Sequence, residues 1–154
     1  MITLFAIKRT FLPLGVALSL ILPLQADSEK SPYTGNVQVK TLLRTSTNSV
    51  GQAIEYPHDH KAEVSVLTVE IAPGGETGWH KHPVPIFAYV LAGEVTVHLA
   101  NGGKHTFHQG EAMAESVDML HNGVNEGKEP TKLLVFVAGE KNVPFTVKEK
   151  TPGK

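Results

Sequence analysis

Short extended segments separated by turns constrain the fold of this chain more than any other feature of its sequence. Val64–Ile71 is rich in β-branched residues, and apolar side chains recur there at every second position, which is the period of a β-strand. Pro73-Gly74-Gly75 ends this segment, and beyond the N-terminal region no window of a dozen residues carries the apolar stripe of an amphipathic helix. Fourteen glycines and ten prolines in 154 residues supply many further turns. The sequence therefore predicts an all-β sandwich or small barrel.

Several segments are expected to be strands of this fold, and one hairpin turn is well marked. Asn101-Gly102 is the strongest hairpin signal in the chain, because both residues tolerate the positive φ of a tight turn. Leu133–Val137 is apolar at every position, so we expect this strand to be buried on both faces. The expected strands are Val37–Leu43, a short extension over Gln52–Tyr56, Val64–Ile71, Ile86–Leu91, Val95–Leu99, Leu133–Val137 and Phe145–Val147.

The first 26 residues have the charge pattern of a secretory signal peptide. Lys8 and Arg9 precede an uncharged apolar stretch over residues 10–26, which ends in a small residue before polar sequence. The alternative is an uncleaved membrane anchor, but a spanning helix needs about 20 apolar residues, and this stretch contains two prolines. We therefore expect cleavage after Ala26 and a periplasmic or secreted mature protein.

Charge and cysteine content narrow the classes of function. The 14 basic residues nearly balance 15 acidic ones, whereas a nucleic-acid-binding protein would usually carry a basic stripe. The absence of cysteine excludes a disulfide framework, thiolate metal ligands and a cysteine nucleophile. Loss of residues 1–26 would leave 128 residues, about one domain, and would change the net charge from −1 to −3. We expect no nucleic-acid partner and, after cleavage, no membrane association.

Two of the eight histidines have the spacing of metal ligands. His80 and His82 lie two residues apart on an extended segment, which directs both imidazoles to the same face. Two imidazole nitrogens on one face can chelate a divalent metal, whereas a single histidine cannot. Pro83 follows the pair and restricts the direction in which the chain leaves. Five other histidines are expected at solvated positions or turns: His58, His60, His98, His105 and His108.

The spacing around this pair resembles the first motif of the cupin superfamily, G-x5-H-x-H-x3,4-E-x6-G. The matching positions are Gly74, His80, His82, Ile86 and Gly93. The second cupin motif, G-x5-P-x-G-x2-H-x3-N, is similar to the positions Gly110, Ser116, Asp118, His121 and Asn125. The two motifs span residues 74–93 and 110–125, and the short gap between them is typical of small, single-domain (type-2-like) bacterial cupins.

The resemblance implies a fold and an assembly. The expected fold is a cupin double-stranded β-helix, or jelly-roll, barrel over residues 37–148. Residues 27–36 would then be a polar leader and residues 149–154 a C-terminal tail. Because an apolar strand such as Leu133–Val137 needs cover on each side, the resemblance also suggests a homodimer in which a second subunit supplies part of that cover.

The chain departs from the cupin motifs at three positions. Ile86 stands where the glutamate ligand of the family would be, which removes one oxygen donor and one negative charge. If this position faces the barrel interior, Ala88 and Val90 share its face, and the wall beneath the histidine pair is apolar. Ser116 and Asp118 replace the proline and glycine of the second motif, and both residue types suit turns. Asn125 is expected to fix a loop by hydrogen bonding.

Three interpretations of the site stay open at this point. In the first, His80, His82 and His121 form a three-histidine metal site. In the second, Glu115, six residues before His121, replaces the missing carboxylate as a fourth ligand; Glu115 is also the one candidate catalytic residue. In the third, the site is metal-free and the histidines bind a polar or anionic ligand. Imidazole suits several divalent transition metals, so Fe, Mn, Zn, Ni and Cu remain candidates.

The resemblance leaves the reaction open, because a fold does not determine a function. Cupins include dioxygenases, isomerases, decarboxylases, lyases and non-enzymatic binding proteins. The first hypothesis is a small exported metalloenzyme of the dioxygenase, isomerase or lyase type that acts on a small organic substrate. The alternative is a non-catalytic module that binds or senses a small molecule in the mouth of the barrel.

Overall fold

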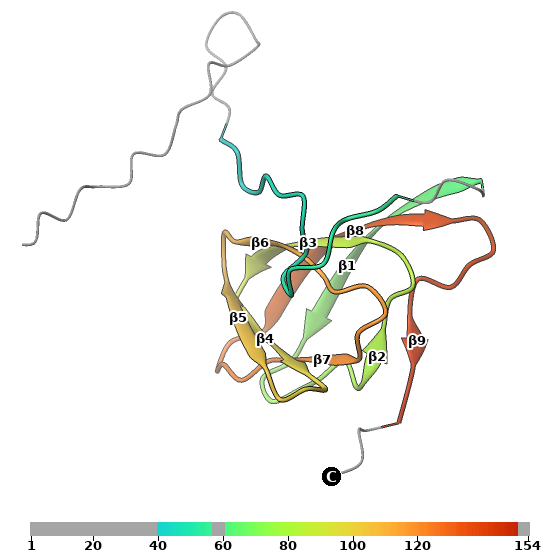
Figure 1. The fold of residues 1–154 in the computed structure, drawn as a ribbon. Helices are drawn as coiled ribbons and strands as arrows, with labels where there is room; N and C mark the ends of the chain where they lie inside the picture. The colour runs from blue at the N-terminus through green and yellow to red at the C-terminus, as the bar shows by residue number, and fades with distance from the viewer. Residues whose placement is uncertain (1–39, 57–60, 151–154) are drawn as a thin grey trace, which may run out of the picture. The chain divides into compact units, whose positions relative to one another are not determined.

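Every regular element of the computed structural model is a β-strand in the part of the chain that it describes, residues 40–56 and 61–150 (Figure 1). These residues belong to one unit that begins at Lys40. Among them, no helix is long and apolar enough to cross a membrane. The strands are β1 (Ala62–Ile71), β2 (His80–Lys81), β3 (Ile86–Ala92), β4 (Glu94–Leu99), β5 (Lys104–His108), β6 (Ala112–Ala114), β7 (His121–Val124), β8 (Thr131–Glu140) and β9 (Val147–Lys148).

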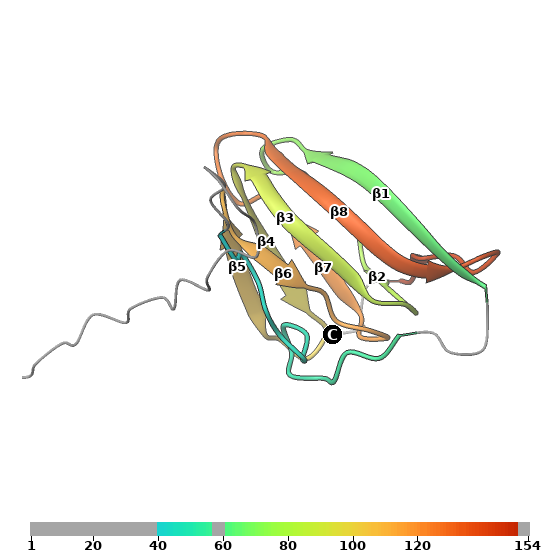
Figure 2. The same ribbon diagram turned by 90° about the horizontal axis from the view of Figure 1, so that it is seen from above.

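Two antiparallel sheets make up the fold. The first sheet has the strand order β1-β8-β3-β6, and the second has the order β5-β4-β7-β2-β9. Figure 2 shows β1, β8 and β3 side by side in the first sheet. Apart from the hairpin of β4 and β5, each strand lies in the other sheet from the strand before it, which is the winding of a double-stranded β-helix. The predicted all-β jelly-roll fold is confirmed.

Buried apolar side chains fill the space between the two sheets. Along β1, Leu67, Val69 and Ile71 belong to or pack against this core, whereas Val64 and Val66 are 71 % and 56 % exposed. This alternation is the period of two that the sequence predicts for this segment. Burying one such apolar side chain contributes about 1.5–3 kcal/mol, so the pattern sets which face of β1 turns inward.

Within the single chain, Leu133–Val137 is buried on one face and not on both. Within β8, Leu133 and Val135 are buried, whereas Phe136 is 42 % exposed. The strand lies between β1 and β3, so one of its faces packs against the core. No layer in the described part of the chain covers the other face. An apolar run therefore identifies the strand correctly but does not show that both faces are covered.

The two expected strands at the start of the described region are absent from the residues that the structure describes. Gln52–Tyr56 contributes only an isolated bridge between Ala53 and Thr47. In the expected strand Val37–Leu43, residues 40–43 are exposed and have no regular structure, and the remaining residues lie outside the described part. Strand propensity alone does not produce a strand where no neighbouring strand pairs with the segment, because a strand is stabilised through its cross-strand partners.

The short strands were the hardest elements to predict. The expected strand Phe145–Val147 is shifted, and β9 covers Val147–Lys148 instead. The strands β2, β5, β6 and β7 were not among the expected ones; each has at most five residues, and three of them carry histidine and other polar side chains. The expected signal peptide and polar leader lie outside the described residues, as do His58 and His60.

The backbone conformation of three turns explains which residue types stand at the motif positions or between the motifs. The predicted hairpin at Asn101-Gly102 is confirmed, since β4 and β5 pair antiparallel around it. Gly93 has a φ of +70°, and a Cβ there would lie 2.7 Å from the carbonyl oxygen of Pro130, so the position requires glycine. Asp118 stands where the second motif has glycine, and its φ of +53° is in the left-handed region that aspartate tolerates.

Candidate metal centre

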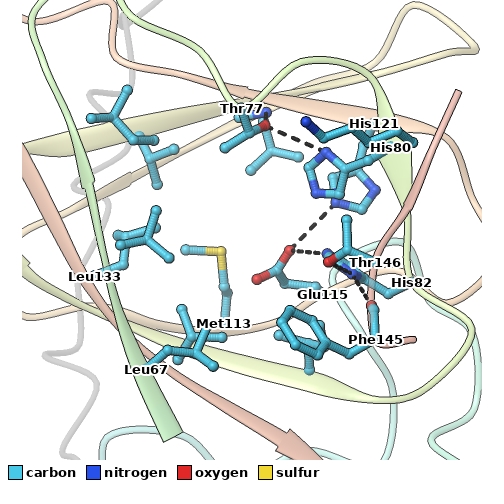
Figure 3. A pocket seen from close by; sticks show the side chains of 18 residues that line it. Leu67, Thr77, His80, His82, Met113, Glu115, His121, Leu133, Phe145 and Thr146 are labelled. Carbon is cyan, nitrogen blue, oxygen red and sulfur yellow. Dashed lines mark hydrogen bonds and ion pairs between the residues drawn. The ribbon is translucent and has the colours of Figure 1, made fainter. Parts of the chain in front are cut away.

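The structure brings His80, His82 and His121 together at one end of the barrel interior (Figure 3). His80 in β2 pairs with His121 in β7, so their side chains leave the sheet next to one another. His82 follows two residues later on the same face, as the spacing predicts. All three are buried, with exposed fractions of 8 %, 5 % and 2 %. One ring nitrogen from each lies within 4.8 Å of the others, a spacing that a single metal ion can bridge.

Backbone carbonyls orient all three imidazoles. Each ring donates a hydrogen bond from Nδ1 to a carbonyl oxygen, which can only accept. The neutral ring therefore carries its proton on Nδ1 and has its lone pair on Nε2. The pairs are His80 with Gly78 at 2.7 Å, His82 with Phe145 at 2.7 Å, and His121 with Met119 at 2.8 Å. This outer arrangement is characteristic of metal-ligating histidines.

One of these nitrogens is only weakly paired. Nε2 of His121 is fully buried and makes no well-formed hydrogen bond in the described part of the chain, although Oε2 of Glu115 lies 3.4 Å away. A buried polar atom without a good hydrogen bond costs free energy, so native proteins rarely leave one in this state. A metal ion between the three Nε2 atoms would use this lone pair. The residues present therefore fit a divalent metal.

Glu115 supplies a carboxylate to the same space. One of its oxygens, Oε2, lies 3.3 Å from Nε2 of His82 and 3.4 Å from Nε2 of His121. The backbone N–H of Glu115 donates to the carbonyl of Ile86 at 2.8 Å, so the two residues are neighbours across the β3–β6 pair. Neighbours on paired strands share a face. The carboxylate that the resemblance places at position 86 is therefore present one strand away.

The second motif holds the first in place. Asp118 donates its backbone N–H to the carbonyl of His82 at 2.8 Å, and Val117 forms a parallel bridge with the same residue. The hydroxyl of Ser116 lies 3.3 Å from Nδ1 of His121. The residues that replace the proline and glycine of the motif thus contact both ligand segments, and the turn they form is intact.

The acidic and basic groups of the site stabilise one another's charged forms. Burial raises the pKa of Glu115, but the contacts with His121 and His82 outweigh burial and lower that pKa to about 2. Burial lowers the pKa of His121, while Glu115 and the carbonyl of Met119 raise it more, so the net pKa lies above the usual value. Burial is the main reason that the pKa of His80 falls below the usual value. A proton therefore competes with a metal ion for Nε2 of His121 more strongly than it would at a free imidazole.

A cavity of about 180 Å³ adjoins the histidines (Figure 3). Its polar side is formed by the three histidines, Glu115 and Thr77, and Phe145, Thr146 and Lys148 of the C-terminal segment also line it. Ile86 faces the interior and, as the strand period predicts for that case, shares its buried face with Ala88 and Val90. The apolar wall consists of Leu67, Val69, Ile71, Ile86, Val95, Val97, Met113, Leu133 and Val135.

The other described histidines lie away from this site, as expected. His98 pairs with Glu126 at 2.8 Å, and His108 lies 3.2 Å from Glu94. His105 is exposed on β5. Asn125 is fully buried and has the expected structural role: its amide donates to the carbonyls of Ile71 and Glu129 and its oxygen accepts from Gly127.

The sequence analysis missed the contribution of the C-terminal segment. The carbonyl of Phe145 orients His82, and Thr146 Oγ1 lies 3.4 Å from the same Nδ1. In Figure 1, β9 lies beside β2, where Lys148 pairs with His80. A backbone carbonyl has no residue-type signature, so no feature of residues 145–148 in the sequence indicates this role.

Comparisons with known proteins agree with this fold. Residues 67–137 match the family model described as cupin domain. A search of curated protein sequences finds no match to the chain. Among solved structures, the DMSP lyase DddQ from Ruegeria pomeroyi aligns with 19 % identity and a TM-score of 0.51, over 59 % of this chain and 45 % of its own.

Two further solved structures illustrate the range of similar proteins. An uncharacterized protein with a double-stranded β-helix domain from Klebsiella pneumoniae aligns with 24 % identity and a TM-score of 0.49, over 70 % of this chain and all of its own. The oxalate decarboxylase from Lactobacillus farciminis aligns with 24 % identity and a TM-score of 0.48, over 55 % of this chain and 26 % of its own. The chain spans less than half of the length of DddQ and of the oxalate decarboxylase.

Proposed function

We propose that this chain, whose residues 67–137 match the cupin domain model, binds one divalent transition metal through His80, His82 and His121, with Glu115 as the fourth ligand. The observation that carries the proposal is the orientation of the rings: three Nδ1 atoms donate to backbone carbonyls, so three Nε2 lone pairs meet beside a carboxylate. The buried Nε2 of His121, which makes no well-formed hydrogen bond among the described residues, supports it further.

The donor set suits several metals and leaves room for a further ligand. Three imidazole nitrogens and one carboxylate oxygen are compatible with Fe, Mn, Zn, Ni and Cu. A metal of five or six coordination would keep positions open toward the cavity, where a bound metal supplies Lewis-acid activation of a ligated oxygen. The apolar residues that line the cavity would orient the bound small molecule and exclude water from it. We propose that the protein is an exported metalloenzyme that acts on a small organic substrate.

Metal content tests the proposal directly. Protein purified from its native compartment is expected to contain about one transition metal ion per chain by elemental analysis, and chelated protein should rebind one equivalent. The His80→Ala/His121→Ala double variant should retain none. Full metal content in this double variant would place any metal elsewhere, and wild-type protein that binds no divalent metal would overturn the proposal.

Metal affinity is expected to fall as pH decreases. A proton and a metal compete for each Nε2 lone pair, and the raised pKa of His121 means that this competition begins above the usual imidazole range near pH 6.5. At lower pH each displaced proton costs about tenfold in affinity per pH unit. Glu115, with a pKa of about 2, stays ionised throughout. Titrations with Zn²⁺ between pH 5 and 8 measure this slope, and an affinity that does not change with pH would contradict histidine ligation.

A non-catalytic binding or sensing module is the second candidate function. Apart from the histidines, the titratable residues that line the described cavity are Glu115 and Lys148, and Glu115 is used as a ligand in our proposal. Few groups therefore remain to transfer protons. A panel of small carboxylic acids and catechols, tested with metal-loaded protein for both binding and turnover, distinguishes the two functions. Binding without turnover of any member favours the module.

We also propose a homodimer that uses the outer face of the first sheet. Phe136 on β8 pairs in register with Val66 on β1 and Phe87 on β3, and Val64 continues this exposed apolar surface. A contiguous exposed apolar patch is typical of an interaction site. Wild-type protein should sediment as a dimer at micromolar concentration, and Phe136→Lys should shift it to monomer.

The control for this experiment is Val143→Lys, which places the same charge at an exposed apolar residue between β8 and β9. It should leave the dimer intact. Wild-type protein that sediments only as a monomer at micromolar concentration would exclude the dimer.

Export is the remaining part of the proposal. Residues 1–26 carry the basic, apolar and small-residue pattern of a cleaved signal. A C-terminally tagged protein is expected outside the cytoplasm with Asp27 as its first residue, which mass spectrometry of the intact protein measures. A mature protein that retains Met1 would contradict cleavage.

A further inference from the structure

We infer that the cavity takes a small monoanion with an apolar body, of the class of short branched carboxylates, and that Glu115 sets this charge preference. The inference rests on the proposed metal centre and names the class of ligand for that site. Two features carry it: the chemistry of the cavity wall and the charge of the donor set.

The cavity has one polar end and an otherwise apolar wall. Figure 3 places the histidines and Glu115 on one side and Leu133, Leu67 and Met113 across the space from His80. Both sheets contribute apolar residues to this wall, and most of these are at least nine-tenths buried. A ligand body that enters this space finds no hydrogen-bonding partner there. An apolar body gains about 25 cal/mol for each Å² it buries, whereas a polar body loses its hydration without replacement.

The volume limits the size of that body. The cavity measures about 180 Å³. An engineered cavity of about 150 Å³ with a similar aliphatic lining accommodates benzene, so this one fits a ligand of roughly six to nine non-hydrogen atoms. Phe145, which is 37 % exposed, lines the cavity next to the histidines. A ligand bound to the metal would therefore extend its body toward the apolar wall.

The charge of the donor set selects among ligands of this size. A divalent metal with three neutral imidazoles and the carboxylate of Glu115 has a net charge of +1. A monoanion neutralises it, a neutral ligand leaves +1, and a dianion leaves −1 in an apolar cavity. Burying an uncompensated charge costs several kcal/mol. Lys148 is the other charged residue that lines the cavity, and it is exposed, so water screens its charge.

Three ligands of nearly the same shape test this selectivity. Isobutyrate is the monoanion, isobutyramide its neutral analogue, and methylmalonate the dianion in which a carboxylate replaces one methyl group. Isothermal titration of Zn²⁺-loaded wild-type protein should give isobutyrate about a tenfold or greater advantage over both others. Methylmalonate or isobutyramide binding as tightly as isobutyrate would overturn the inference.

Two variants separate the charge effect from the shape effect. Glu115→Gln, measured at full Zn²⁺ occupancy, raises the net charge to +2 and should remove or reverse the preference over methylmalonate. If the Glu115→Gln protein does not bind Zn²⁺, the Ile86→Glu variant is measured instead. It lowers the net charge of the metal and its ligands to 0 and should remove the preference for isobutyrate over isobutyramide. An unchanged preference in the variant measured would overturn the role of Glu115. Lys148→Met is the matched control and should leave the selectivity unchanged; a lost preference would assign it to Lys148 instead.

A third variant tests the apolar wall. Leu133→Trp fills the cavity from β8, on the side opposite His80, and should weaken isobutyrate about tenfold while leaving formate binding unchanged. Equal effects on both anions would show that the ligand body does not occupy the cavity. Metal occupancy is measured first in every case. Wild-type protein without bound Zn²⁺ would refute the metal centre, whereas loaded protein without the monoanion preference would refute only this inference.

Discussion

His121→Ala is expected to lower the affinity for a divalent metal on the order of a hundredfold. Zinc sites with four ligands contribute about 10–16 kcal/mol of binding energy, or about 3 kcal/mol for each ligand, and a hundredfold change in affinity is about 2.7 kcal/mol. His121 is the most buried of the three histidines, and its Nδ1 is held by the carbonyl of Met119. No water replaces its nitrogen easily at a position that is 2 % exposed. Competition with a chelator of known affinity measures the change.

The matched control is His98→Ala. This histidine also belongs to a strand of the second sheet, but its Nε2 pairs with Glu126 and it lines no part of the cavity. Metal affinity should stay within about twofold of the wild-type value, since surface pairs contribute little. Equal losses in the two variants would indicate a general effect of histidine removal and would refute ligation by His121.

The second large expected effect is a loss of metal affinity when the carboxylate at position 115 is removed, and its recovery when a carboxylate is placed at position 86. Glu115→Gln should cost about tenfold or more in metal affinity, because it removes the only carboxylate among the cavity-lining residues. Adding Ile86→Glu to that variant should recover most of the loss. Ile86 and Glu115 are neighbours across the β3–β6 pair, and both side chains face the cavity. A glutamate at either position can therefore reach the same metal.

The metal affinities of the wild type, the two single variants and the double variant distinguish the two metal-bound interpretations. With Glu115 as a ligand, Ile86→Glu alone adds little, since one carboxylate is already present. With a three-histidine site, Glu115→Gln is nearly silent and Ile86→Glu tightens binding through a new charged donor. Glu129→Gln, an exposed residue outside the cavity, controls for the loss of one negative charge. Silence of Glu115→Gln in chelator competition would rule out the fourth ligand.

Local periodicity and motif spacing were enough to predict the fold and the meeting of the three histidines. The period of two in Val64–Ile71 fixed its inward face, and the same period placed His80 and His82 on one face. His121 could be added only through the motif spacing, because its contact with His80 is a cross-strand pairing between β2 and β7. Such pairings are set by tertiary structure and have no local signature.

The role of Glu115 could not be decided from the sequence for the same reason. Its position depends on the register of β3 and β6, and the sequence analysis did not detect β6 at all. The exposure of Phe136 was missed because an apolar strand residue looks the same whether or not its face is covered. The carbonyls that orient the histidines, such as that of Phe145, belong to the backbone and so are not encoded in residue type.

The hydrogen bond from His82 to Phe145 joins residues that are 63 positions apart in the chain. A nascent chain that has not yet been synthesised through residue 145 cannot orient the second histidine, although all three histidines are already present. Long-range contacts of this kind form late in folding, because the entropy of closing the intervening loop opposes them. If the chain binds a metal as proposed, loading would follow completion of the β2–β9 pair. If the chain is also exported in an unfolded state, the metal would be supplied by the compartment of arrival.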